Sequence, residues 1–356
     1  MRVKLKDITK FSKGTQINGK NLIDDGAYSY LNGGINPSGK WNEFNVAENT
    51  VTISEGGNSS GYVNYMSKAF WCGAHCYYLY DGPKNSKYLY YALKSQQERL
   101  FRIRSGACMP NIKKSDLGNF IIEYEEDETR QEEVVKVLEK CELLIEDYNK
   151  KLALLDEAVR ARFVEMFGDL RVNDKGWKYY KLDELTELIT DGEHATPKRT
   201  TQGIYLLSAR NVLNHQLSLE DVDYIDYDEF SRISRRIIPR EGDVLISCSG
   251  SIGRCCVVPK NIKFQMVRSI ALLRFKSNIN PVFAEYMITS DYLQDQINKS
   301  KTASSQANLF QGKIKSLKGV VPPLELQNQF ASFVQEIDKS RLLSNHPLFL
   351  LKSMIF

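Results

Sequence analysis

The chain has 356 residues, of which 42% are hydrophobic and 26% charged, the composition of a globular protein long enough for two domains. No run approaches the roughly 18 apolar residues of a membrane span, and Met1–Lys6 lacks the apolar core of a signal peptide. Seven cysteines at irregular spacing argue against a secreted disulfide framework, so we expect a cytoplasmic protein without a membrane partner.

The formal net charge of +4 is unevenly distributed along the chain. Residues 1–122 carry +7, residues 123–170 carry −8, residues 171–322 carry +5, and residues 323–356 are neutral. Two basic regions are therefore separated by an acidic segment. A basic region favours an anionic partner such as nucleic acid, although charge also varies by chance along any chain.

The first basic region is predicted to consist of short strands and turns followed by a helix. Thr50–Ser54 and Cys76–Tyr80 are apolar or alternating runs between clusters of Gly, Asn and Pro, which is typical of strands. Tyr88–Arg102 has apolar residues at spacings of three and four, which indicates helix.

The acidic segment after residue 129 predicts a long helix with a heptad seam. Followed to Phe167, this helix covers about 37 residues, or roughly 55 Å, with no glycine or proline inside it. Such a helix could pack on its own domain, but an uninterrupted seam favours a coiled coil. The predicted seam residues are Val134, Leu138, Cys141, Ile145, Tyr148, Leu152, Leu155 and Val159.

The second basic region repeats this pattern of elements. Val244–Ser247 and Ile270–Phe275 are predicted strands, and Pro281–Lys299 has helical spacing. A last, shorter helix carries an equivalent seam, with Arg341 and Ser344 at its two middle positions and a kink or break expected near Asn345-His346-Pro347. Its apolar seam residues are Phe330, Val334, Ile337, Leu348, Leu351 and Ile355.

Four stretches of the first half resemble stretches of the second half, in the same order and at offsets of about 177 to 197 residues. They pair Val3–Ile8 with Tyr180–Leu185, Thr50–Ser54 with Asp243–Ser247, Ser105–Leu117 with the stretch ending at Ile314, and Gln131–Leu138 with Gln327–Val334. We therefore predict an α+β fold in which two mixed domains, residues 1–128 and 170–322, form a pseudo-repeat. Long helices at 129–169 and 323–356 separate and follow them and form an intramolecular coiled coil.

The sequence predicts neither a catalytic nor a metal site. It has no phosphate-binding Gly-x4-Gly-Lys-Ser/Thr and no His-Glu-x-x-His motif, and only four histidines. Cys72–Cys76, with Cys108, resembles part of a zinc site but lacks a second well-spaced pair. We expect buried thiols on strands there, and equally at Cys248, Cys255 and Cys256.

Two serine–glycine loops, Gly56–Gly61 and Ser249–Arg254, are candidates for contact with DNA. Glycine lets a backbone approach a phosphate, serine hydroxyls can bond phosphates or base edges, and arginine can pair with guanine. Hairpin turns and solvated helix faces are the alternative interpretations. The candidate DNA-binding residues are Asn58, Ser59, Ser60, Arg99, Arg102, Arg104 and Ser105 in the first copy, and Ser249, Ser251, Arg254, Arg268, Lys301, Ser304, Ser305 and Gln306 in the second.

Over nearly its whole length the chain resembles the specificity subunits of type I restriction–modification systems. Three stretches carry the resemblance most clearly: Gly242–Ser247 with its serine–glycine loop, Val321–Phe330, and Ala161–Asp169 at the end of the long helix. The chain departs from the family's usual pattern in Glu123–Glu128, where the second copy has Pro322-Pro323, and in its shorter last helix.

The resemblance implies two target recognition domains, each reading one half of a split double-stranded DNA site in the major groove. The helices would set the spacer length and dock two methyltransferase subunits, joined by restriction subunits that translocate and cleave DNA. It implies that the chain itself is not an enzyme and binds no cofactor. S-adenosylmethionine belongs to the methyltransferase, and ATP and magnesium belong to the restriction subunit. A DNA-modifying enzyme with an acidic site, and a coiled-coil interaction protein without DNA affinity, are the alternative hypotheses.

Overall fold

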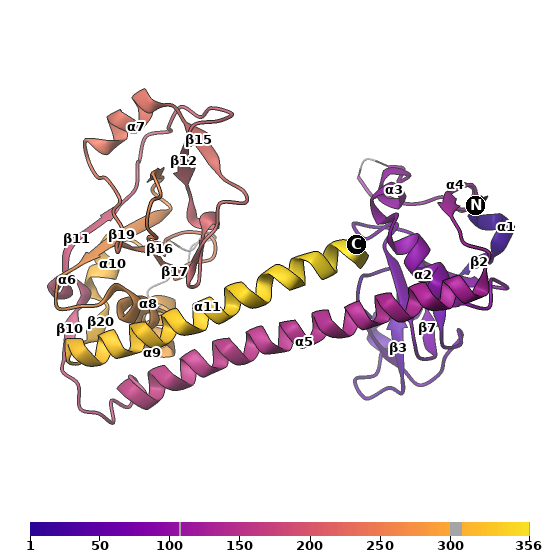
Figure 1. The fold of residues 1–356 in the computed structure, drawn as a ribbon, viewed down its shortest axis with the longest axis horizontal. Helices are drawn as coiled ribbons and strands as arrows, with labels where there is room; N and C mark the ends of the chain where they lie inside the picture. Colours follow the sequence, from indigo (N-terminus) through magenta and orange to yellow (C-terminus); the bar gives the residue numbers. More distant parts are fainter. Residues whose placement is uncertain (107, 300–307, 356) are drawn as a thin grey trace. The chain divides into compact units, whose positions relative to one another are not determined.

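The computed structural model describes residues 1–106, 108–299 and 308–355 (Figure 1). The chain forms two compact units: unit 1 is built from Met1–Lys151 and Leu343–Phe356, and unit 2 from Leu152–Leu342. In the described part of the chain, no helix combines the length and apolarity needed to cross a membrane.

Unit 1 is a mixed α+β body whose short strands alternate with turns. Its strands are β1 (Arg2–Lys4), β2 (Lys10–Lys13), β3 (Tyr28–Leu31), β4 (Gly39–Trp41), β5 (Thr50–Ser54), β6 (Val63–Met66), β7 (Phe70–Cys72), β8 (Cys76–Tyr80) and β9 (Ile121–Glu123). Its helices are α1 (Leu5–Ile8), α2 (Ser86–Lys94), α3 (Gln97–Arg102), α4 (Lys114–Gly118) and the first part of α5 (Glu128–Phe167). The predicted strands Thr50–Ser54 and Cys76–Tyr80 are confirmed.

Unit 2 repeats this order of elements with a few additions. Its strands are β10 (Tyr179–Lys181), β11 (Thr186–Asp191), β12 (Ile204–Leu207), β13 (Val212–Leu213), β14 (Gln216–Leu217), β15 (Asp223–Ile225), β16 (Val244–Ser247), β17 (Cys255–Val257), β18 (Phe264–Met266), β19 (Ile270–Phe275) and β20 (Lys318–Val320). Its helices are α6 (Leu182–Leu185), α7 (Tyr227–Ser234), α8 (Pro281–Thr289), α9 (Asp291–Lys299), α10 (Gln311–Ser316) and the first part of α11 (Leu324–Ile355). The strands predicted at Val244–Ser247 and Ile270–Phe275 are also confirmed.

The sheets confirm the internal repeat. The strand orders β1-β9, β4-β3-β7 and β2-β8-β5-β6 of unit 1 recur in unit 2 as β10-β20, β15-β12-β18 and β11-β19-β16-β17. The pairing directions match as well, since β3–β7 and β12–β18 are the parallel pairs of the two units. Helix α2 packs on β5 and β6, and helix α8 packs on β16 and β17 (Figure 1).

Equivalent hydrogen bonds let the two units be aligned residue by residue. Gly14, after β2, donates to the carbonyl of Cys76, and Gly192, after β11, donates to that of Ile270. Both glycines are required, because a Cβ would lie 1.9 Å from the Cys72 oxygen at Gly14 and 2.3 Å from the Met266 oxygen at Gly192. Lys13 and Asp191, the residues just before these glycines, therefore occupy equivalent positions.

Helix starts are fixed by the same side chains in both copies. Asn85 caps α2 by accepting from the Tyr88 amide, and Asn280 caps α8 by accepting from the Val282 amide. At the start of the long helices, the predicted partners Gln131 and Gln327 are both buried and donate to backbone carbonyls of the preceding segment. These bonds satisfy polar groups that would otherwise be unpaired in the interior.

The predicted seam lies between α5 and α11 in each unit. In unit 2, Val159 and Phe163 of α5 share a core with Val334 and Phe330 of α11. The helices run antiparallel there, because Phe163 contacts Phe330 while the earlier Asp156 pairs with the later Arg341. In unit 1, Cys141 packs with Tyr91 of α2, and Leu138, Ile145 and Leu351 border this pair. Tyr148, Leu152, Leu155 and Ile337 are half-buried, as seam positions should be.

Three predictions about helices need correction. Val134 is exposed, and Val135 packs against the Cys141 cluster in its place, because the seam turns gradually around a straight helix. Of the kink or break predicted near Pro347, the break is wrong, since α11 is continuous from Leu324 to Ile355 although a proline inside a helix removes one backbone hydrogen bond. The helical stretches Tyr88–Arg102 and Pro281–Lys299 each divide into two helices.

Candidate nucleic-acid interface

The two serine–glycine loops have the same backbone scaffold. In unit 1 the amide of Glu55 donates to the His75 carbonyl at 2.8 Å, and the amide of Ile112 donates to the Glu55 carbonyl at 2.9 Å. In unit 2 the amide of Cys248 donates to the Ser269 carbonyl at 2.8 Å, and Leu309 donates to Cys248 at 2.9 Å. Each loop is thus held between a strand-connecting turn and a downstream Asn-Ile or Asn-Leu segment.

Some candidate residues of unit 1 bond the backbone of the unit itself, and others are exposed to solvent. Ser60 is fully buried and its hydroxyl donates to the Glu55 carbonyl, so it holds the loop. Ser59 donates to the Gly33 carbonyl at 2.6 Å, and Arg104 donates to the Ser60 carbonyl at 2.7 Å. Asn58 at the loop tip is exposed and available to a ligand.

The remaining candidates of unit 1 lie on and after α3. Arg99 and Arg102 are exposed on this helix, and the Arg99 guanidinium lies 5.1 Å from the Phe120 ring centroid. Ser105 pairs with Asn111 through a side-chain hydrogen bond of 2.9 Å next to the loop. The helix and the loop therefore border the same side of unit 1 without forming one compact cluster of side chains.

In unit 2 the candidate residues line two cavities beside the loop. One, of about 390 Å³, is lined by Ser249 and Arg268 together with Asp191, His194, Cys248, Ser269 and Asn308, among others. The other, of about 440 Å³, is lined by Ser249, Ser251 and Arg254, with Ser208 and Arg210 opposite. Ser249 and Ser269 belong to both linings, so the cavities adjoin. Lys301, Ser304, Ser305 and Gln306 lie outside the described residues.

A polar cluster that the sequence analysis did not predict lies in unit 1 where strands β2 and β5 end. The Glu55 carboxylate accepts from Lys13 Nζ at 2.7 Å and lies 3.4 Å from His75 Nδ1. The Glu55 side chain is 14% exposed, whereas that of His75 is 60% exposed. The carboxylate therefore holds two cation-forming groups at the surface beside the serine–glycine loop.

Unit 2 has a comparable cluster centred on Asp191. Its carboxylate accepts from Arg236 Nη2 at 2.7 Å and lies 2.7 Å from His194 Nε2. Burial opposes ionisation of this group, but the bonds from Arg236, its own backbone and His194 together lower the pKa of Asp191. His194 is 59% exposed and lines the 390 Å³ cavity.

Five of the six cysteines predicted to be buried thiols match that prediction; four of the five lie in strands and Cys248 directly follows β16, whereas for Cys108 the prediction is wrong. Cys72, Cys76, Cys248, Cys255 and Cys256 are buried, whereas Cys108 is exposed. Burial, and secondarily the charge of Asp191, raise the pKa of Cys248 to about 12. Within the part of the chain that the structure describes, no three His, Cys, Asp or Glu side chains gather as metal ligands would.

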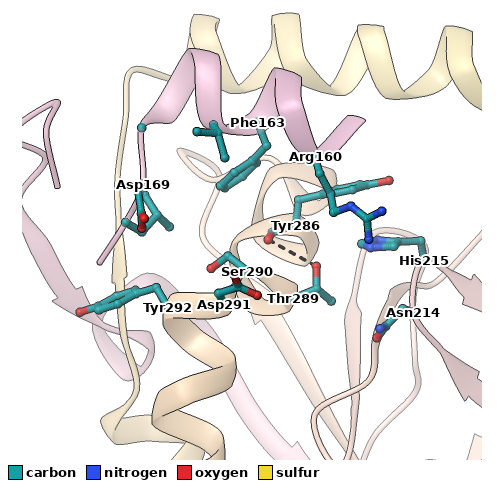
Figure 2. Close-up of a pocket in the computed structure, with 13 residues that line it drawn as sticks. Arg160, Phe163, Asp169, Asn214, His215, Tyr286, Thr289, Ser290, Asp291 and Tyr292 are labelled. Atoms are coloured by element: carbon teal, nitrogen blue, oxygen red, sulfur yellow. Dashed lines mark hydrogen bonds between the residues drawn. The ribbon is translucent and has the colours of Figure 1, made fainter. Parts of the chain in front are cut away.

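A separate cavity of about 310 Å³ lies in unit 2 where α5 ends (Figure 2). Phe163 and Arg160 of α5 face Tyr286 of α8 and the β13–β14 turn. The His215 ring from that turn stacks on Tyr286, with ring centroids 4.0 Å apart. Among the predicted DNA-binding residues that the structure describes, none lines this cavity.

A family model now decides the identity of this scaffold. The model of the type I restriction modification DNA specificity domain matches the chain twice, at residues 1–156 and 174–347. The chain belongs to this family. The two matches coincide with the two copies of the repeat, and the family is the one that the sequence resembles.

Individual members of the type I specificity family agree with this assignment. A putative type I specificity subunit of Mycoplasma pneumoniae is 32% identical over 209 residues, 51% of this chain and 56% of that protein. One of Mycoplasma genitalium is 32% identical over 201 residues, 49% of this chain and 52% of that protein. These alignments span about half the length of the relatives, both of which are named as putative type I specificity subunits.

A solved structure of the family shares the fold. The crystal structure of the type I restriction–modification S subunit from M. genitalium aligns with 99% of this chain and 93% of that chain, with a TM-score of 0.62 and 19% sequence identity. This similarity supports the architecture of two mixed domains with long helices. At that identity it carries no information about individual DNA contacts.

Proposed function

We propose that this specificity-family chain reads a split double-stranded DNA site, one half with unit 1 and the other with unit 2. The repeat is the observation that carries this proposal, because the two units share one scaffold and differ in the side chains at its loops. Two units with the same backbone scaffold but different surface side chains can recognise two half-sites of different sequence.

The chemistry of the loops supports contact with DNA rather than with an apolar ligand. Arg99 and Arg102 in unit 1, and Arg268 beside the unit 2 loop, are exposed cations that can pair with phosphates or guanine. Ser249 offers a hydroxyl in the cavity that Arg268 lines, and Asn58 offers an exposed amide at the tip of the unit 1 loop. We propose that the predicted DNA-binding set acts through these exposed members, with Ser60 supporting the loop from inside.

Two methyltransferase subunits and the restriction subunits are the proposed protein partners. Helix α5 carries exposed apolar side chains outside its seam, which offer a partner helix or sheet apolar surface to bury. These side chains are Val134, Val137, Leu143, Leu144, Leu154 and Val164. We propose that they contribute to docking, and that S-adenosylmethionine, ATP and magnesium are bound by the partners, not by this chain.

Docking is tested with Leu143→Glu, because that side chain is 62% exposed and its replacement should not disturb the seam. We expect loss of co-purification with the methyltransferase of the same system and retention of the fold. The matched control is Glu146→Gln on the same helix, which should co-purify like the wild type. Equal co-purification of both variants would exclude the neighbourhood of Leu143 from the docking surface.

Long-read methylation mapping tests the function as a whole. Cells that carry the methyltransferase are compared with and without this chain, and we expect a split adenine-methylated motif only when the chain is present. The same motif without the chain would refute the proposal. Binding of the purified chain to DNA should also weaken steeply with salt, whereas a coiled-coil interaction protein without DNA affinity would show no such dependence.

A further inference from the structure

The structure assigns specificity-determining roles to His75 and His194, which we propose each contact one base pair in the major groove, in the half-sites read by unit 1 and unit 2. The inference rests on the proposed function and names residues that the sequence did not single out. Both histidines are exposed, and both have one ring nitrogen held by a carboxylate at the same edge of the repeated sheet.

The two clusters occupy corresponding places although their residues come from different loops. His75 lies between β7 and β8, whereas His194 follows β11. In the hydrogen-bond alignment, the positions of Glu55 and His75 are taken in unit 2 by Cys248 and Ser269. Because His194 lines one cavity together with Cys248 and Ser269, its ring lies in the part of unit 2 that matches the surroundings of His75.

The carboxylate and the cation of each cluster also come from different segments in the two units. Lys13 and Asp191 are equivalent, so the strand end before the shared glycine carries a cation in unit 1 and an anion in unit 2. Unit 1 supplies its carboxylate from Glu55, and unit 2 supplies its cation from Arg236 after α7. Each unit thus builds the same triad of carboxylate, cation and histidine from different parts of the fold.

The carboxylate fixes which nitrogen of each ring points outward. His75 Nδ1 lies 3.4 Å from Glu55, and His194 Nε2 lies 2.7 Å from Asp191. Because a carboxylate can only accept, we infer that these nitrogens carry the proton, which leaves Nε2 of His75 and Nδ1 of His194 for a ligand. In the neutral ring the outward nitrogen accepts a hydrogen bond. The major-groove donors that fit it are the amino groups of adenine and cytosine, so each histidine selects A or C on the strand it contacts.

The placement beside the serine–glycine loops makes this contact compatible with phosphate binding. A Cβ at Gly56 would lie 4.0 Å from His75 Nδ1, and Ser249 lines the same cavity as His194. The loop backbone and nearby arginines can therefore hold the phosphates while the histidine reaches a base edge. Glu55 and Asp191 act as positioning residues, because they orient the rings without facing the base themselves.

The test maps methylation in cells that carry the methyltransferase and either the wild-type chain, His75→Ala or His194→Ala. We expect each variant to relax one position of one half-site and to leave the other half-site unchanged, so each serves as the other's control. Asp191→Asn should also change the base preference at the His194 position, since an amide can donate to Nε2 and make Nδ1 the donor. A purely supporting role of Asp191 would alter the yield of methylation without altering that base.

The outcomes separate the inference from the function on which it rests. A wild-type chain that directs no split motif overturns both. A wild-type split motif that both histidine variants preserve overturns the assignment of the histidines alone. Where a variant abolishes methylation, a DNA-binding competition tests the assignment instead. In it, the wild-type site competes with sites that differ at a single base pair for binding to the chain. Discrimination of roughly five- to 150-fold at one base pair should fall toward one, and unchanged discrimination overturns the assignment.

Discussion

Replacing Phe163 by alanine should destabilise unit 2 selectively, although Phe163 belongs to the long helix α5. Its side chain is 5% exposed and lies in an aromatic cluster. The ring centroid is 4.9 Å from that of Phe167, 5.4 Å from that of Phe330 and 5.9 Å from that of Phe283. The last turns of α5 are therefore part of the core of unit 2, held by α8 and α11.

The expected loss follows from this packing. A buried phenylalanine replaced by alanine costs about 3–5 kcal/mol, since apolar burial is lost and a cavity remains. Contacts between aromatic rings add about 0.5–1.5 kcal/mol per pair, which places Phe163→Ala near the upper end of that range. Val164→Ala is the matched control, because the neighbouring side chain is 53% exposed and its loss should change the free energy of unfolding by less than about 0.5 kcal/mol.

Tryptophan fluorescence can follow unit 2 alone. The chain has three tryptophans, and only Trp177 belongs to unit 2, where its indole donates to the Phe167 carbonyl at 2.8 Å. In a Trp41→Phe, Trp71→Phe background, Phe163→Ala should lower the urea midpoint by about 2 M, given a slope of about 2 kcal/mol per M. An unchanged midpoint, or an equal fall with Val164→Ala, would refute the assignment of this helix end to the core.

Three further measurements test the fold. Lys94 is buried, donates to the Val63 carbonyl at 3.1 Å, and has a pKa lowered to about 8 by burial. Since the unfolded chain then binds more protons between pH 8 and 10.5, the free energy of unfolding should rise across that window by about 3 kcal/mol relative to Lys94→Met, and parallel pH profiles would contradict this. Gly14→Ala should cost about 3 kcal/mol because its Cβ would overlap the Cys72 oxygen, whereas Gly19→Ala, with open space around it, should be nearly neutral in the same denaturation assay. In native thiol labelling, only the exposed Cys108 should react quickly, and a second fast thiol would show that the strands open.

The architecture could be predicted from the sequence because it depends on patterns that repeat. The strands at Thr50–Ser54 and Val244–Ser247 follow from local apolar runs, and the seam of α5 follows from its heptad spacing. The pairing of Gln131 with Gln327 was visible as a weak match, and both side chains are buried at equivalent helix starts. Local pattern and shared order were sufficient for these features.

The candidate site could be predicted only in part, because its key contacts join residues distant in sequence. Lys13 and Glu55 are 42 positions apart, and Asp191 and Arg236 are 45 apart, so no spacing rule connects them. The serine–glycine loops were recognisable, but which serine faces inward depends on tertiary contacts: Ser60 is buried whereas Ser251 is exposed. His194 gave no local signal, and His75 was noted only within Cys72–Cys76, the stretch that resembles part of a zinc site.

The alignment of the two units separates backbone requirements from side-chain choice. At Gly14 and Gly192 the approach of a neighbouring strand excludes any side chain, so both copies must carry glycine. One residue earlier, Lys13 and Asp191 share the backbone position yet have opposite charge. A position whose backbone is fixed while its side chain can vary lets one scaffold present two chemically different surfaces. A search of the sequence for such positions would therefore start from the residues beside the shared glycines. The backbone of these residues is fixed by the sheet, whereas their side chains can differ in charge and size.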